Sequence, residues 1–175
     1  MKTIWTIGHS TRSLEEFLIL LNSFNIKTLV DVRHYPGSRK FPQFNKDSLE
    51  VSLPEYGIEY THLVNLGGRR KPIPNSKNDA WRLDSFKGYA DYMETETFQK
   101  SLKILEEIAS EKNTAIMCAE AVWWSCHRSM ISDILKVEGW TVLHIMGENK
   151  ATEHPYTAPA KVVDGKLNYA ATEKG

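Results

Sequence analysis

Short apolar runs alternate along the chain with longer stretches in which apolar residues recur every three or four positions. The short runs predict five strands, at residues 4–7, 27–32, 59–63, 114–118 and 141–145. The longer stretches predict helices, the first after a capping box of Ser13 and Glu16 and the others at residues 47–53, 86–93, 96–111 and 126–137. This alternation predicts an α/β fold, with a mostly parallel sheet of about five strands and helices on both faces.

Two further segments complete this outline. Residues 65–78 contain two glycines and two prolines and are typical of a loop. Residues 161–169 place an Asp-Gly pair between two short extended segments, which predicts a small C-terminal hairpin. The chain has 175 residues and shows no repeat, linker or low-complexity segment, so we expect a single domain over residues 1–175.

The predicted topology indicates where a ligand would bind. In open α/β sheets the ligand site lies beyond the carboxyl ends of the strands. Four polar segments follow predicted strands, and we expect them to lie along one edge of the sheet. These segments are His9-Ser10, Asp31-Val32-Arg33, residues 65–70 and residues 118–128.

The composition is that of an ordinary soluble protein, with 41% hydrophobic and 25% charged residues. No apolar run approaches the roughly 20 residues that span a bilayer, and the N-terminus lacks a signal-peptide pattern. Two cysteines do not make an extracellular disulfide framework. We therefore expect a cytoplasmic protein with no membrane association, and the sequence leaves its oligomeric state open.

The formal net charge is zero, but the cations are unevenly distributed. Residues 33–46 carry four cations and no acid, and residues 65–78 do the same. Either run alone is typical of a solvated loop, whereas two runs that each follow a strand favour an anion-binding mouth. The first run also contains Tyr35, Phe41 and Phe44. Cations beside aromatics suit a nucleobase next to its phosphate, although aromatics that anchor a loop onto the core would give the same pattern.

The segment from Cys118 to Arg128 gathers both cysteines, Glu120, His127 and an arginine within eleven positions. With Ser125 as the N-cap, Cys126-His127-Arg128 would open a helix whose free N–H groups, with the Arg128 fork, suit a phosphate or carboxylate. An ordinary helix start with an exposed histidine and arginine is the alternative.

The two cysteines allow three interpretations. A thiolate at Cys118 or Cys126 would be activated by the helix dipole and Arg128, whereas a buried thiol would be structural. Metal binding would use Cys118, Cys126, His127 and His9, but seven residues separate the cysteines, against roughly two to four in common zinc sites. We therefore predict neither a metal nor another cofactor.

Glu120, Asp31 and His9 each allow two interpretations, one catalytic and one structural. Glu120 and Asp31 would each act as a general base or as an ion-pair partner that orients an arginine. His9 would carry a proton or cap the end of the first strand.

These positions together resemble the domain of unknown function 488 (DUF488) family. The matching motifs run almost the length of the chain: Thr6-Ile7-Gly8-His9-Ser10; Asp31-Val32-Arg33 with Pro36, Ser38, Arg39 and Phe41; Gly57-Ile58, Tyr60-Thr61-His62 and Leu66-Gly67-Gly68-Arg69; Cys118-Ala119-Glu120 and Cys126-His127-Arg128; and Val163-Asp164-Gly165. The resemblance implies an α/β fold and a polar site built from these motifs, and it implies no reaction.

A weaker likeness is to rhodanese-type and cysteine phosphatase folds. Asp31-Val32-Arg33 looks like the rhodanese strand end, and a strand, a cysteine, a loop, an arginine and a helix follow later in the chain. However, nine residues separate Cys118 from Arg128, more than phosphatases use, and the intervening loop contains no glycine. This departure argues against sulfur or phosphoryl transfer through Cys118.

The sequence favours an enzyme that acts on an anionic, nucleotide or nucleic-acid-derived substrate. The alternatives are a non-catalytic nucleotide or nucleic-acid binding module and a cysteine-dependent redox or sulfur-transfer protein. The expected partner is an anionic small molecule or a nucleic acid. The candidate catalytic residues are Glu120, His9, His127 and Cys126, and the candidate substrate-binding residues are Ser10, Asp31, Arg33, Ser38, Arg39, Gly67, Gly68, Arg69 and Arg128.

Overall fold

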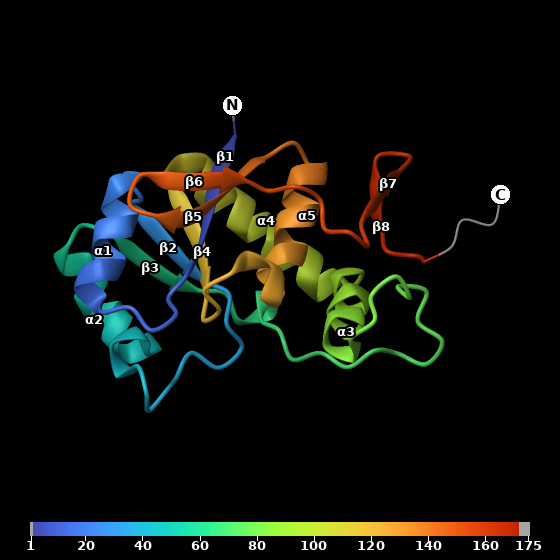
Figure 1. Cartoon of the computed structure of the whole chain (residues 1–175), viewed down its shortest axis with the longest axis horizontal. Helices are drawn as coiled ribbons and strands as arrows, with labels where there is room; N and C mark the ends of the chain where they lie inside the picture. The colour runs from blue at the N-terminus through green and yellow to red at the C-terminus, as the bar shows by residue number, and fades with distance from the viewer. Residues whose placement is uncertain (1, 172–175) are drawn as a thin grey trace.

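A computed structural model, which describes residues 2–171, confirms the α/β class. A six-stranded sheet of order β3-β2-β4-β1-β5-β6 lies between helices on both faces (Figure 1). Its first five strands are mutually parallel, and β6 is antiparallel to β5. The strands are β1 (Thr3–Gly8), β2 (Thr28–Asp31), β3 (Glu59–His62), β4 (Thr114–Cys118), β5 (Thr141–Gly147) and β6 (Lys150–Glu153).

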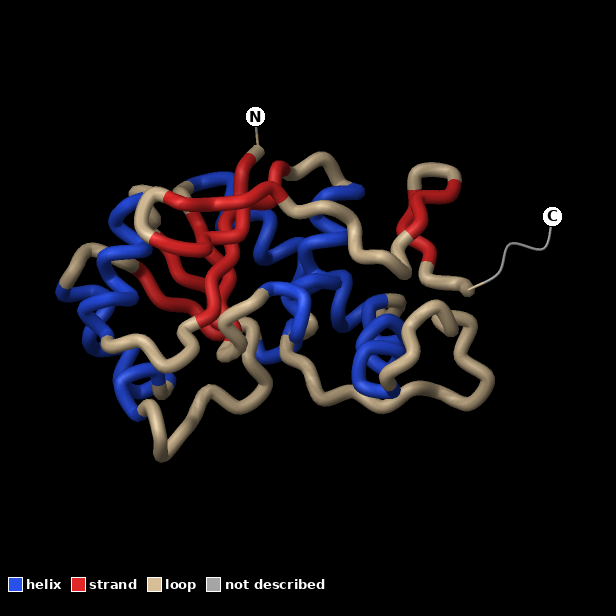
Figure 2. Tube along the Cα trace, in the orientation of Figure 1, coloured by secondary structure: helices blue, strands red, loops and turns tan. Residues whose placement is uncertain are grey.

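The strand register aligns the carboxyl ends of the central strands. Gly8 at the end of β1 is opposite Cys118 at the end of β4, and Asp31 at the end of β2 is opposite Met117. The loops that follow these three strands therefore leave the sheet side by side, along its lower edge in Figure 2.

Five α-helices of residues 2–171 cover the sheet, and the first begins as predicted. Ser13 Oγ accepts a hydrogen bond from the Glu16 N–H at 3.1 Å, and Glu16 Oε1 accepts one from the Ser13 N–H at 3.0 Å. This reciprocal pair satisfies two N–H groups that have no partner within the helix. The helices are α1 (Leu14–Ser23), α2 (Lys46–Glu55), α3 (Asp84–Met93), α4 (Glu96–Glu111) and α5 (Arg128–Val137).

The sheet separates two apolar cores. Leu29, Ala115 and Met117 face the core that α1 and α2 cover, whereas Ile116 and Cys118 face the core that α3, α4 and α5 cover. Side chains alternate along a strand, so neighbouring residues of β4 belong to opposite cores. This alternation points the Cys118 side chain toward α5.

A chain of buried polar groups crosses the α5 side of the sheet. Thr6 Oγ1, His144 Nδ1, His144 Nε2, His154 Nδ1, His154 Nε2 and Asp133 Oδ1 follow one another at hydrogen-bond distance, and all four residues are at most 1% exposed. A carboxylate only accepts, so His154 Nε2 donates to Asp133 Oδ1. Burial lowers the pKa of His144 to about 2, so the His144 ring is neutral.

The C-terminal hairpin is present with the predicted turn. It consists of β7 (Lys161–Val163) and β8 (Lys166–Asn168). Asp164 and Gly165 between them both have positive φ, of 53° and 75°, as a tight two-residue hairpin turn requires.

Two predictions of secondary structure need correction. The edge strand β6 was not expected, because three of its four residues are exposed and carry no apolar alternation. The last helix begins at Arg128 rather than at residue 126, because a 3-10 turn at Trp123–Ser125 and an extended Cys126 precede it.

Gly8 offers a direct test of the approach between β1 and the loop after β4. A Cβ atom on Gly8 would overlap the carbonyl group of Glu120. We expect Gly8→Ala to lower the free energy of unfolding by about 1–3 kcal/mol, since crowding of this kind forces the backbone to shift. Urea denaturation measures this change.

Gly37→Ala is the matched control, because a Cβ on Gly37 would meet nothing within 4 Å. Its free energy of unfolding should equal that of the wild type. Equal stability of the two alanine variants would contradict the close approach of Gly8 to Glu120.

Candidate functional site

The four polar segments that follow strands do meet at one edge of the sheet. Two hydrogen bonds join three of the segments: Ser10 N to Ala119 O (2.9 Å) and His127 Nε2 to Val32 O (2.7 Å). The fourth is bound to His34, the residue directly after Asp31-Val32-Arg33, through His34 Nδ1 and Gly68 O (3.0 Å).

Arg33 is held by a full set of partners. Its Nε and one terminal nitrogen donate to the two carboxylate oxygens of Asp31, at 2.9 and 2.7 Å. The same carboxylate accepts from the Arg33 N–H and from the Tyr60 hydroxyl, and the Arg33 guanidinium also donates to Phe44 O. Asp31 is fully buried, so it orients and neutralises Arg33 instead of facing solvent.

His9 packs against this ion pair. Its Nδ1 lies 2.9 Å from the carbonyl oxygen of Ser10, which can only accept, so Nδ1 carries the proton and Nε2 the lone pair. That lone pair accepts from Arg33 at 3.3 Å, and the ring stacks on Phe44 at 4.5 Å between centroids. Burial lowers the pKa of His9, and the ring is neutral at neutral pH.

His127 is the less constrained base. Its Nε2 donates to Val32 O, so Nδ1 keeps a lone pair, and within the described part of the chain this nitrogen has no hydrogen-bond partner. Gly68 lies beside it, where a Cβ would come within 3.1 Å of Nδ1. Burial lowers the pKa of His127 to about 4, which keeps the ring neutral and able to accept a proton.

Arg128 differs from Arg33 in having no counter-ion. Its side chain is 2% exposed and its guanidinium donates only to two backbone carbonyls, of Glu120 at 3.2 Å and Ala121 at 3.4 Å. Nε has no partner, and no carboxylate of residues 2–171 forms an ion pair with this guanidinium.

Arg12 adds a second cation that the sequence did not single out. Its guanidinium donates to Gly8 O at 2.6 Å. Burial lowers the pKa of Arg12; the nearby Glu16 carboxylate raises it, and the positive charge of Arg128 lowers it further. The only signal for this residue in the sequence is its position in the loop after the first strand.

The N-terminus of α5 is not the free anion cradle that we predicted. The Arg128 N–H points at Cys126 Sγ at 3.4 Å, and the next two N–H groups donate to Cys126 O and His127 O. Ser125 does not cap the helix, because its hydroxyl donates to Val122 O and His127 occupies the N-cap position. The arginine side chain, and not the helix terminus, supplies the positive charge here.

The two cysteines touch each other. Cys118 is 2% exposed, Cys126 is partly exposed, and their Sγ atoms are 2.7 Å apart with no disulfide between them. Glu120, two residues after Cys118, has an exposed side chain that makes no hydrogen bond or ion pair with the described residues. In the same part of the chain, no three potential metal ligands cluster.

The remaining candidates lie on the outer part of the edge. Ser38 Oγ accepts from two N–H groups of its own loop, and Arg39 is exposed. Arg69 is also exposed and lies over the ring of Tyr35 at 5.2 Å. Gly67 packs directly against the backbone of His34. None of these four residues forms a hydrogen bond or ion pair with Arg12 or Arg128 among the described residues.

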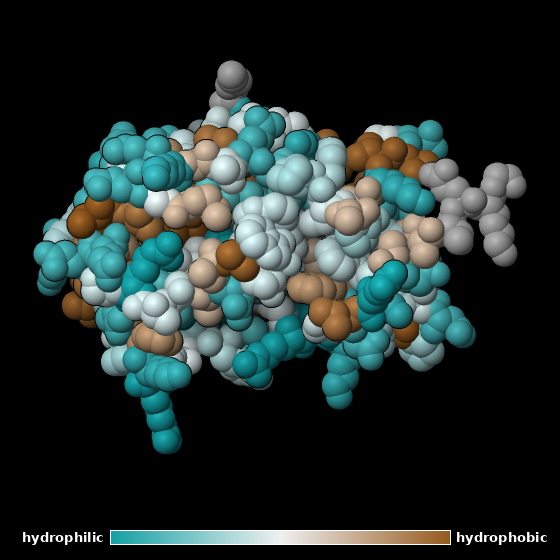
Figure 3. All heavy atoms as spheres, viewed as in Figure 1, coloured by the Kyte–Doolittle hydropathy of each residue, from teal (hydrophilic) through white to brown (hydrophobic). Residues whose placement is uncertain are grey.

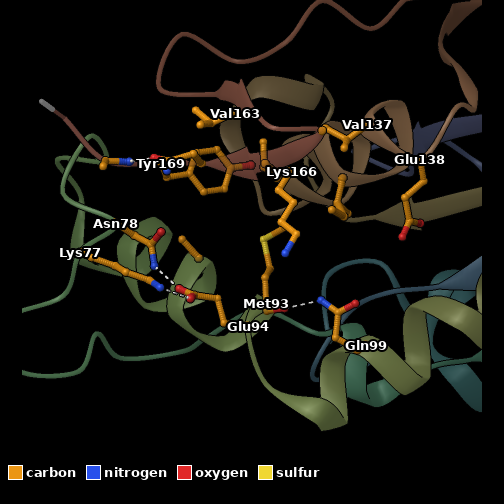
Figure 4. Close-up of a pocket in the computed structure, with 16 residues that line it drawn as sticks. Lys77, Asn78, Met93, Glu94, Gln99, Val137, Glu138, Val163, Lys166 and Tyr169 are labelled. Carbon is orange, nitrogen blue, oxygen red and sulfur yellow. Dashed lines mark hydrogen bonds and ion pairs between the residues drawn. The ribbon is translucent and has the colours of Figure 1, made fainter. Parts of the chain in front are cut away.

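A cavity of about 810 Å³ lies elsewhere, between the C-terminal hairpin and helices α3 and α5 (Figure 4). Lys77 and Glu94 form an ion pair of 2.8 Å at its wall. None of the predicted site residues lines it. Long hydrophilic side chains project from the lower edge of the molecule in Figure 3, where the loops after the strands gather.

A family model described as domain of unknown function DUF488 matches residues 13–135. No curated protein and no solved structure matches the chain. The likeness to rhodanese-type proteins finds no support in these comparisons. Within residues 2–171, every helix is too short or too polar to cross a membrane.

The neutral state of His127 predicts a dependence of stability on pH. Between pH 6.5 and pH 4 the unfolded chain binds a proton at this residue and the folded chain does not, so the free energy of unfolding falls as the pH falls. His127→Gln keeps an N–H donor for Val32 O but does not titrate.

We expect the wild-type free energy of unfolding to decrease more steeply than that of His127→Gln over this range. Above pH 6.5 the two curves should run parallel. Urea denaturation at a series of pH values measures both curves, and parallel curves down to pH 4 would show that His127 charges as readily in the folded protein as in the unfolded chain.

Proposed function

The chain belongs to the DUF488 family, whose description assigns no activity, and we propose from the site itself that it is an enzyme. Its substrate is an anion, either a nucleotide or derived from a nucleic acid. The substrate binds at the carboxyl edge of the sheet, against Arg12 and Arg128. Free thiols at Cys118 and Cys126 favour a reducing compartment, so we place the protein in the cytoplasm.

The observation that carries this proposal is the uncompensated charge of Arg128. Burial of a cation costs several kcal/mol unless an opposite charge and hydrogen bonds offset it. Arg33 has that compensation in Asp31, whereas Arg128 has two carbonyl oxygens and an unpartnered Nε. A phosphate or carboxylate would supply both the missing charge and acceptors for the guanidinium.

His127 supports a catalytic role for the site. A general base must be unprotonated and have a lone pair in reach of its substrate. The bond from Nε2 to Val32 O leaves Nδ1 as the acceptor, and the absence of a side chain at Gly68 leaves space beside it. His9 is the second base, although Arg33 already occupies its lone pair.

The outer edge favours a nucleotide or nucleic acid over a simple anion. Tyr35 is 65% exposed with Arg69 over its ring, and Trp124 is 57% exposed on the loop that precedes α5. Exposed aromatic faces beside cations stack bases while the cations contact phosphates. A non-catalytic binding module would use the same surface, and only turnover separates the two functions.

Anion binding is tested with Arg12→Gln and Arg128→Gln, using a labelled short single-stranded oligonucleotide and fluorescence anisotropy. Each variant should lose about tenfold or more in affinity, because a charge-assisted contact to the anion is removed. Arg12 is only partly buried, so its variant tests the site even if Arg128→Gln unfolds.

Lys27→Ala is the control, since Lys27 is exposed and precedes β2 at the opposite edge of the sheet. Its affinity should match that of the wild type. Folded Arg12 and Arg128 variants with wild-type affinity would refute the proposed anion site.

Turnover is tested on nucleoside 5′-phosphates and on the same oligonucleotides, with product detection by mass spectrometry. Wild-type protein should convert at least one of them, and His127→Gln should bind it with unchanged affinity and lose most of the rate, since the base is removed. Tight binding with no conversion across the whole set would instead establish the binding module.

A further inference from the structure

The two cysteines are close enough to react with each other. Their Sγ atoms lie 2.7 Å apart, against about 2.0 Å in a disulfide, so an approach of about 0.7 Å would close the bond. Cys118 ends β4, and Cys126 has an extended backbone one residue before the α5 N-cap. The segment between them is a surface loop, which can follow such a movement more easily than a strand or helix.

The surroundings favour one thiolate in this pair. Burial raises the pKa of Cys118, but the hydrogen bond from the Cys126 thiol and the charge of Arg128 outweigh it and lower that pKa. Burial and the neighbouring Cys118 raise the pKa of Cys126. Of the two thiols, Cys118 is therefore the one that ionises more readily, and the thiolate is the reactive form of a cysteine.

We propose that Cys118 and Cys126 form a reversible redox site, which a small hydroperoxide oxidises from the dithiol to an intramolecular disulfide. This assignment does not depend on the proposed function. It rests on the contact between the two sulfur atoms, on the position of Arg128 beside them and on their restricted access.

The oxidation balances in two steps. The Cys118 thiolate attacks one peroxide oxygen, the O–O bond breaks, and the released alkoxide or hydroxide takes up a proton, which leaves Cys118 as a sulfenic acid. The Cys126 sulfur then attacks the Cys118 sulfur, so that the S–S bond forms, the S–O bond breaks and water leaves with the Cys126 proton. In total, two thiols lose two electrons and two protons, and the peroxide is reduced.

The burial of the pair decides which oxidants can act. Cys118 is 2% exposed and Cys126 is only partly exposed, so a bulky disulfide has no direct access to the thiolate. Hydrogen peroxide is far smaller, so the partial exposure of Cys126 favours it as the oxidant. The nearby thiol then captures the sulfenic acid before a second peroxide arrives.

The test uses the full chain, treated with a slight excess of hydrogen peroxide and then unfolded in N-ethylmaleimide. We expect that N-ethylmaleimide labels neither cysteine, that the mass of the chain is lower by two hydrogen atoms, and that dithiothreitol restores both thiols to labelling. Peptide mapping should show a link between the peptides that contain Cys118 and Cys126. Two thiols still labelled, irreversible sulfinic acid, or a link between two chains would each overturn the proposal.

Cys126→Ser is the matched variant, because position 126 is less buried than position 118 and the substitution keeps the side chain nearly the same size. Without its partner, Cys118 should stop at the sulfenic acid, which dimedone traps, and wild-type protein should give little of this adduct. Equal trapping in the two proteins would show that Cys126 does not resolve the intermediate and would overturn the redox pair.

Discussion

The buried guanidinium of Arg128 is the constraint on which the carboxyl edge of the sheet depends. No carboxylate of residues 2–171 is paired with it, so backbone groups must face it, and the carbonyls of Glu120 and Ala121 do so. That orientation brings the Glu120 carbonyl against Gly8, where no side chain fits. The loop after β4 is therefore shaped by the need to solvate one cation inside the protein, since an unsatisfied buried charge is far more costly than a strained approach between two backbones.

Arg33 and Arg128 lie at the same edge of the sheet but differ in their partners, and this difference decides which of them can bind an external anion. Arg33 and Asp31 form an internal pair, with Tyr60 and Phe44 using the remaining donors and acceptors. This pair stabilises the end of β2 and holds His9 in one tautomer, and it offers an external anion little. Arg128 is also buried, but its guanidinium has no negatively charged partner among the described residues and its Nε has no hydrogen-bond partner. We therefore propose the anion site on the β1 and β4 side of the edge, although both arginines follow strands in the sequence.

The elements with a strong apolar period could be predicted from the sequence, and residues 96–111 and 114–118 match α4 and β4 to the residue. The edge strand β6 could not, because its exposed side chains carry no such period. Ser125 is a good N-cap by residue type, yet its hydroxyl binds Val122 O in a preceding turn, which only the folded loop reveals. The convergence of the strand ends followed from topology alone. The sequence could not show that Arg33 is paired with a carboxylate and that Arg128 is not, because this depends on whether a carboxylate lies near each guanidinium in space.

The thiol pair and the proposed anion site would share the charge of Arg128. The charge of Arg128 lowers the pKa of Cys118, so a bound anion and an ionised Cys118 would compete for the same guanidinium. Oxidation to a disulfide would remove the thiolate and leave an external anion as the only negative partner of the guanidinium. The two proposals are thus linked through one electrostatic interaction while resting on separate observations: the missing carboxylate at Arg128 for anion binding, and the contact of two sulfur atoms for the redox site. A substrate that binds better to the oxidised than to the reduced protein would be the physical consequence of that shared charge.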